Sequence, residues 1–312
     1  MIDQPGAYAI SEAEYHADPC PEPSLSASVA AILLNQSPWH AWTAHPRLNP
    51  TFEPEDKATF DLGRAAHDLM LTGLRNFAVI EAADWRTKEA KQQRDDARAA
   101  GKTPILAHHL KNAEAMIAAG RAQLARMSDP IDRRAFTDGT GQPEIALVWR
   151  EGPAWCRSRL DWRPADGAIF HDYKTTGASA HPDAWQRTAY GMGADIQAGL
   201  YRRAIRAVYG IEEPEFRFVV QENYPPYALA VVALTPAALD MAERKAFHAI
   251  RLWQQCIAAD RWPGYPARPC YIDPPAYEEA RWLEVEERAQ QAKRQGEDLL
   301  KLALDMQAPL TV

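Results

Sequence analysis

Two charged residues stand two positions apart inside an apolar run of the sequence, IFHDYKTT at positions 169–176. In a β-strand, Asp172 and Lys174 would point to the same face of the sheet. A carboxylate beside an ammonium group can be a plain ion pair at the end of a strand. The same two groups also suit phosphoryl transfer, in which a carboxylate holds a metal ion and the ammonium group stabilises developing negative charge.

A second carboxylate, on the preceding predicted strand, favours phosphoryl transfer. Asp161 lies near the end of AWCRSRLDWR, and the turn-like RPADGA leads from there to the strand of Asp172. If the two strands pair, the carboxylates approach each other. Two converging carboxylates repel unless a cation lies between them, and hard cations prefer oxygen ligands. The spacing D-x10-D-x-K therefore predicts a site for Mg²⁺ or Mn²⁺, with Lys174 placed to hold a phosphate oxygen or orient the attacking water.

The elements that must position these residues alternate between helices and short apolar strands. This order predicts an α/β fold with a mixed sheet covered by helices. Residues 1–23 are expected to be irregular, 24–270 to form the body with a helical insert at about 84–127, and 271–312 to form a charged helix and tail. We expect helices at 25–45 (broken at Pro38), 56–73, 86–102, 108–127, 182–210, 235–259 and from 276 to about 306, and strands at 143–150, 154–163, 168–175, 215–222 and 227–234.

Charge and composition limit the class of protein. The net charge of −7 argues against a surface that coats nucleic acid everywhere. Bases outnumber acids between residues 84 and 126, however, which suggests a local anion site. The four cysteines show no CxxC spacing and are expected to be free thiols. Without a visible signal peptide or an apolar run of about 20 residues, the sequence predicts a cytoplasmic protein that contacts no membrane.

Four motifs in a fixed order carry a resemblance to a known family. The segments SRLDW and FHDYKTT resemble the catalytic core of the PD-(D/E)XK nuclease superfamily. LGRAAHDLM, with Gly63 and His67, and DIQAGLY, with Gln197 and Tyr201, are similar to the corresponding helices of its RecB-like branch. LSASVAAILLNQSPWHAW and the basic WRTKEAKQQRDDARAAGK further resemble RecE-type (exodeoxyribonuclease VIII-like) phage exonucleases. The likeness covers roughly residues 24–270.

This resemblance implies a PD-(D/E)XK nuclease core, a mixed central sheet flanked by helices, with an N-terminal helical region. It also implies a metal-dependent exonuclease that digests duplex DNA from 5′ ends, forms a ring-shaped homo-oligomer (trimer or tetramer) and works beside a single-strand annealing protein. The implied metal ligands are His67, Asp161, Asp172 and the carbonyl of Tyr173. The other implied catalytic residues are Lys174, Gln197, Tyr201 and, as an extra metal or water ligand, Glu144. The candidates for contact with DNA are Arg159, Ser37 and the basic residues Arg86, Lys88, Lys91, Arg94 and Arg98.

Other interpretations stay open at this point. Taken alone, His67 could be a helix histidine satisfied by its neighbours, and the basic insert could be a solvated helix. A RecB-like endonuclease, or a Cas4-like nuclease without an iron–sulfur cluster, fits the same motifs, since Cys256 and Cys270 are too widely spaced for a cluster. A phosphatase of the aspartyl-phosphate type would need an acid where Lys174 stands. A catalytically silent DNA-end-binding protein on the same fold is a further alternative.

Overall fold

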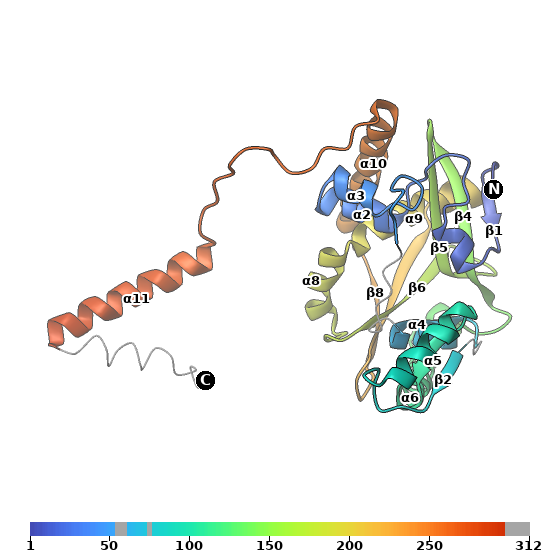
Figure 1. The fold of residues 1–312 in the computed structure, drawn as a ribbon, viewed down its shortest axis with the longest axis horizontal. Coiled ribbons are helices and arrows are strands. Elements are labelled where there is room, and N and C mark those ends of the chain that lie inside the picture. The colour runs from blue at the N-terminus through green and yellow to red at the C-terminus, as the bar shows by residue number, and fades with distance from the viewer. Residues whose placement is uncertain (54–60, 74–76, 297–312) are drawn as a thin grey trace. The chain divides into compact units, whose positions relative to one another are not determined.

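The computed structural model describes residues 1–53, 61–73 and 77–296. The chain divides into two compact units, Met1–Gly264 and Tyr265–Val312. The first unit is built on a six-stranded sheet with the order β1-β4-β5-β6-β7-β8 (Figure 1). Its strands are β1 (Gly6–Tyr8), β4 (Gly141–Glu151), β5 (Ala154–Pro164), β6 (Ile169–Thr176), β7 (Glu215–Glu222) and β8 (Leu229–Ala233).

The sheet is mixed, as the sequence predicts. β6 and β7 run parallel, and every other neighbouring pair is antiparallel. A parallel pair needs a crossover connection, and α8 (Pro182–Met192) and α9 (Ala194–Tyr209) supply it between these two strands. The crossover places α9 over the strands that carry Asp161 and Asp172.

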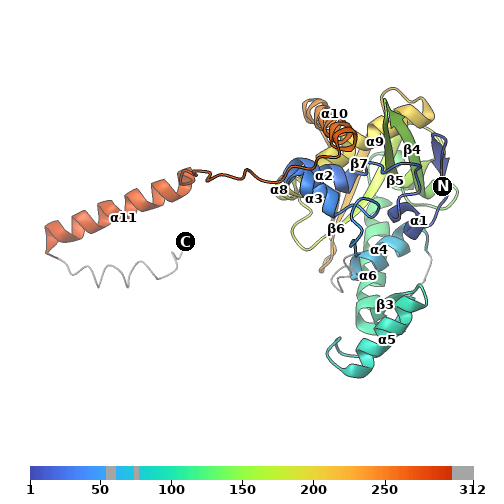
Figure 2. The same cartoon turned by 45° about the horizontal axis from the view of Figure 1, so that its top comes forward.

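Two hydrophobic cores cover the two faces of this sheet. On one face, α2 (Ala27–Asn35), α3 (Pro38–Thr43), α8, α9 and α10 (Pro236–Ala259) bury residues such as Leu160, Phe170 and Phe218. On the other face, α4 (Asp61–Leu71) and α6 (Ala107–Leu124) pack on Trp162 and Tyr173. Figure 2 shows α4, β3 and α5 gathered around α6 on this second side.

The second face carries a small lobe of its own. β2 (Phe77–Ile80) and β3 (Thr103–Leu106) form a parallel two-stranded sheet, and α5 (Lys88–Ala99) packs on both. The short α7 (Pro130–Arg134) follows α6 and leads into β4. The sequence analysis predicted neither β2, β3 nor α7, because runs of four or five residues carry too little periodicity to be recognised.

The N-terminus differs from the expectation of an irregular segment. β1 pairs with β4, and α1 (Glu12–His16) forms a short helix. A capping box stabilises its start: Ser11 Oγ accepts from the Glu14 N–H, and the Glu14 carboxylate accepts from the Ser11 N–H. The helix predicted over 182–210 is instead two helices, since Gly193 adopts a left-handed φ of 78° between them.

The second unit contains α11 (Ala276–Gln295), a charged helix with mostly exposed side chains. The remainder of the helix predicted to reach about residue 306, and the start of the helix predicted at 56–60, lie outside the described residues. Among the described helices, none combines the length and the apolar character that crossing a membrane requires.

Candidate active site

The side of α4 that carries Gly63 and His67 lies against β6. A Cβ atom added to Gly63 would lie 3.4 Å from Oγ1 of Thr175. His67 follows one turn later on the same side of the helix. Its Nε2 lies 3.2 Å from Oδ2 of Asp161, and its Nδ1 lies 3.8 Å from Oε1 of Glu144. The Gly63–His67 spacing thus places an imidazole beside the carboxylates of two strands.

Asp161 is fixed between β5 and β6 by a backbone hydrogen bond. Trp162 of β5 pairs with His171 of β6. Two residues further along β6, the N–H of Tyr173 donates to Oδ2 of Asp161 at 2.8 Å. A side chain of one strand therefore satisfies a backbone donor of the next, which holds the carboxylate at the site.

Asp172 is completely buried and has partners on both oxygens. Lys174 forms an ion pair with its Oδ2, and the amide of Gln197 donates to its Oδ1 at 2.7 Å. Tyr201, one turn after Gln197 on α9, donates its hydroxyl to the carbonyl of Arg159 at 2.8 Å. The Gln197–Tyr201 pair therefore ties α9 to both strands of the site.

Burial and neighbouring charges shift the pKa values of Asp172, Asp161, His67 and Lys174. Burial, followed by the charge of Asp161, raises the pKa of Asp172 to about 6. Burial also acts to raise the pKa of Asp161, but the charge and hydrogen bond of His67 outweigh it, so this pKa is lowered. Burial acts to lower the pKa of His67, yet Asp161 raises it to about 9. For Lys174, the charges of Asp172 and Asp161 overcome burial and raise the pKa. Shifts with such causes concentrate at functional sites.

Glu144 enters the site through an unusual backbone conformation. Its φ of 56° lies in the left-handed region, which costs a residue with a Cβ atom about 1–3 kcal/mol. It stands on β4 between two residues that pair regularly with β5. Its carboxylate meets His67 and also forms an ion pair with Arg159 at 3.1 Å. The backbone strain therefore falls on Glu144, a residue whose carboxylate contacts the cluster.

The donor set fits a hard divalent cation. Ligand atoms of His67, Asp68 and Glu144 lie within 4.8 Å of one another, and Asp161 touches the same imidazole. A set of nitrogen and oxygen donors that contains no cysteine suits Mg²⁺ or Mn²⁺. It does not suit a metal that prefers thiolate ligands. Burial raises the pKa of Asp68 to about 6. Sequence reasoning missed Asp68, although its position directly after His67 was a usable signal.

Comparison with known proteins shows the family of the chain. A family model described as "PDDEXK-like domain of unknown function (DUF3799)" matches residues 34–273. The chain belongs to this family. No curated protein sequence matches it.

One solved structure is similar to this PDDEXK-like protein over most of its length. A protein named "putative exonuclease" from Eubacterium rectale shares 14% sequence identity, with 88% of this chain and 98% of that chain covered and a TM-score of 0.56. At this identity the likeness shows the fold. A second protein, SSO0001, covers 67% of this chain and 97% of its own at 11% identity, but its TM-score of 0.26 carries no argument.

The candidates for DNA contact are placed unevenly. Arg159 lies in the cluster, next to Glu144. The hydroxyl of Ser37 is used locally, because it caps α3 and bonds Nδ1 of His40 at 2.6 Å. The remaining five belong to α5 or the turn before it, and α5 packs on β2 and β3 rather than on the strands of the site. These five are Arg86, Lys88, Lys91, Arg94 and Arg98.

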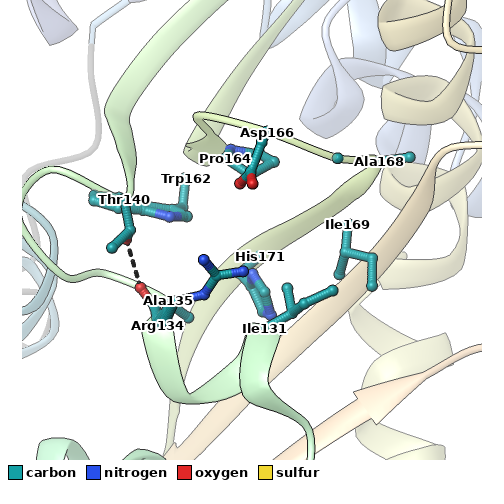
Figure 3. Close-up of a pocket in the computed structure, with 11 residues that line it drawn as sticks. Ile131, Arg134, Ala135, Thr140, Trp162, Pro164, Asp166, Ala168, Ile169 and His171 are labelled. Carbon is teal, nitrogen blue, oxygen red and sulfur yellow. Dashed lines mark hydrogen bonds between the residues drawn. The ribbon is translucent and has the colours of Figure 1, made fainter.

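A separate hollow lies by the β5–β6 turn and takes no part in the cluster. Figure 3 shows His171, Trp162, Arg134 and Asp166 around it. His171 precedes Asp172 on β6, so its side chain points to the opposite face. Its Nε2 lies 2.8 Å from Asp132. This hollow therefore opens away from the carboxylates of the candidate site.

Proposed function

We propose that this protein is a metal-dependent deoxyribonuclease, and specifically a 5′-to-3′ exonuclease that hydrolyses phosphodiester bonds from the ends of duplex DNA. The observation that carries the proposal is the joining of Asp161, Asp172 and Lys174 across two adjacent strands, with His67 contacting Asp161 from α4. A buried ion pair is by itself weak evidence for a purely stabilising role, because its Coulombic gain is offset by the cost of desolvating both charges. The cluster does suit a reaction in which negative charge develops on phosphate.

The chain's own residues have separable roles in this proposal. His67, Asp161, Asp172 and the Tyr173 carbonyl are the proposed metal ligands, and Glu144 and Asp68 add carboxylates beside His67. Bound Mg²⁺ or Mn²⁺ would supply Lewis-acid stabilisation of a phosphate oxygen and a more acidic water.

The cationic and polar groups position the reacting atoms. Lys174 is held by Asp172 and is placed to bind a phosphate oxygen or to orient the attacking water. Gln197 fixes the orientation of Asp172, and Tyr201 fixes the backbone of β5. Arg159 offsets the charge of Glu144 and provides a guanidinium for the scissile strand.

Action from DNA ends is the finer part of the proposal. It is supported by the fold shared with a protein named as an exonuclease and by the resemblance of LSASVAAILLNQSPWHAW and WRTKEAKQQRDDARAAGK to RecE-type exonucleases. The same proposal includes a ring-shaped homo-oligomer, a single-strand annealing partner, a cytoplasmic location and phosphate binding by α5.

Digestion of linear duplex DNA, labelled separately at its 5′ and 3′ ends, tests the activity and its polarity. With Mg²⁺ or Mn²⁺ we expect early release of 5′-terminal label, no reaction in EDTA, and no cutting of a covalently closed circle. Early release of 3′ label would reverse the polarity. Cutting of the circle would support the endonuclease alternative, and binding of ends without any cutting would support a silent end-binding protein.

A further inference from the structure

The helix α1 borders two cavities that lie on either side of the catalytic cluster. The first, with a volume of about 310 Å³, is lined by Glu12 together with His67 and Glu144. The second, of about 240 Å³, is lined by His16 together with Lys174. Glu12 and His16 are one helical turn apart and lie 3.7 Å from each other. One short helix therefore extends from the metal-ligand side of the cluster to the lysine side.

The chain before α1 is fixed to the sheet. β1 pairs with β4 in regular antiparallel register, with Ala7 opposite Leu147. Tyr15, the one buried residue of α1, lies under the guanidinium of Arg157, whose Cζ is 5.5 Å from its ring centroid. The helix is thus anchored by the strand that precedes it and by the contact of Tyr15 with Arg157.

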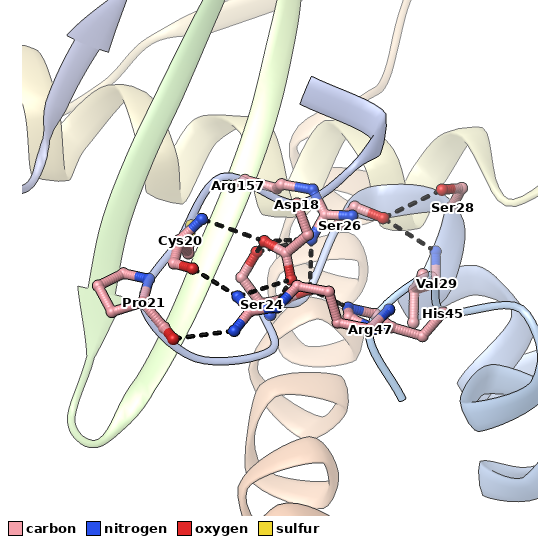
Figure 4. Close-up of polar contacts among 10 residues, drawn as sticks. All are labelled: Asp18, Cys20, Pro21, Ser24, Ser26, Ser28, Val29, His45, Arg47 and Arg157. Atoms are coloured by element: carbon pink, nitrogen blue, oxygen red, sulfur yellow. Dashed lines mark hydrogen bonds and ion pairs between the residues drawn. The ribbon is translucent and has the colours of Figure 1, made fainter. Parts of the chain in front are cut away.

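The chain after α1 is fixed by a buried ion cluster, drawn in Figure 4. Asp18 is inaccessible to solvent at its carboxylate and accepts hydrogen bonds from the N–H and Oγ of Ser24 at 2.8 and 2.6 Å. Arg157 and His45 approach the same carboxylate at 3.2 and 3.3 Å. Leu25 then joins β5 through backbone bonds on both sides. Anchors on both sides make α1 a fixed wall rather than a moving lid.

Glu12 presents a carboxylate to the first cavity. The other charged or titratable side chains that line this cavity are of both signs: Arg64, His67, Arg159, Asp68 and Glu144. A DNA strand continuing past the cluster in this direction would therefore meet the helix itself and the carboxylate of Glu12. The segment lies before residue 34, where the family match begins.

We propose that α1 closes one end of the path that a DNA strand would follow across the cluster. It thereby restricts the site to strands that terminate there. This inference rests on the proposed nuclease function and assigns its dependence on DNA ends to residues 11–17 within a single subunit. A strand that is continuous on both sides of the scissile bond would clash with the wall, whereas a terminal strand would stop against it.

The test replaces residues 11–17, SEAEYHA, by a flexible glycine–serine segment of equal length and keeps β1 and Asp18. Linear and covalently closed single-stranded DNA of one sequence are compared with Mn²⁺. The unaltered chain should digest the linear form and spare the circle. The replacement should raise circle cleavage at least about tenfold while linear cleavage stays within about threefold. If the replaced chain does not fold, Glu12→Ser/His16→Ser in the full chain should raise circle cleavage about threefold.

Binding in Ca²⁺ supplies a second readout that does not depend on cleavage. The unaltered chain should bind the linear form about tenfold more tightly than the circle, and replacement of residues 11–17 should remove this preference. If both chains cleave linear DNA and both spare the circle, the proposed role of α1 is overturned, but the proposed function is not. Failure of the unaltered chain to cut linear duplex DNA would overturn the proposed function. Equal binding of circular and linear DNA by that chain would overturn the proposed role of α1.

Discussion

Replacement of Asp18 by alanine removes a carboxylate that joins three segments of the first unit. The carboxylate accepts two hydrogen bonds from Ser24 and pairs with Arg157 and His45. The Arg157 side chain is only 4% exposed, so the substitution leaves a buried guanidinium without its anion. Breaking a buried pair by removing one partner typically costs about 3–5 kcal/mol, and we expect a loss of this size in the free energy of unfolding.

Urea denaturation followed by tryptophan fluorescence measures this loss by linear extrapolation. Asp183→Ala is the matched control, since the Asp183 side chain is 95% exposed and its partner His181 lies 3.9 Å away. The control should change the free energy of unfolding by no more than about 0.5 kcal/mol. A loss below about 1 kcal/mol for Asp18→Ala would refute the reasoning, because the buried guanidinium would then need no carboxylate.

Three further predictions follow from the same structure. Burial acts to raise the pKa of Asp18, but the hydrogen bond of His45 and the charge of Arg157 lower it from 3.8 to about 2. The stabilisation is therefore complete above about pH 4 and is lost as the pH falls towards 2. In acid titration, the difference in unfolding free energy between wild type and Asp18→Asn should narrow by about 2.5 kcal/mol. Gly199→Ala should destabilise the fold by about 1–3 kcal/mol in urea denaturation, since its Cβ would lie 2.3 Å from the backbone of α10, while Gly191→Ala, with open space around it in α8, should stabilise by about 0.4–1 kcal/mol. Gln197→Leu should lower the rate of DNA hydrolysis by about 10–100-fold in folded protein, because it removes the donor that orients Asp172; an unchanged rate would contradict that role.

Much of the central sheet could be predicted from the sequence because its strands are long and bounded by clear turns. The runs at 143–150, 154–163 and 168–175 agree with β4, β5 and β6 to within two residues at each end. The joining of Asp161 with Asp172 followed from the turn between their strands. The mixed order of the sheet followed from one helical crossover between β6 and β7.

What the sequence could not show depends on contacts between distant segments. β1 is three residues long and exists only because β4 offers an edge, and Asp18 is buried by partners up to 139 positions away (157 − 18). The left-handed conformation of Glu144 has no sequence signal, since any prediction for a glutamate inside a strand would be extended. Asp68 and His67 meet Glu144 of β4 only once α4 has docked on the sheet.

The central claim is that Lys174 serves hydrolysis rather than a structural ion pair, and one matched substitution tests it. Lys174 and Lys245 each pair with an aspartate whose side chain is 1% exposed, Asp172 and Asp195, but only the first pair adjoins Asp161. Both alanine variants leave a buried carboxylate without its cation, so their costs in stability should be similar. With Mn²⁺ and linear duplex DNA, Lys174→Ala should lower the rate of hydrolysis at least about 100-fold and Lys245→Ala by less than about threefold. Equal rates for the two folded variants would contradict the claim.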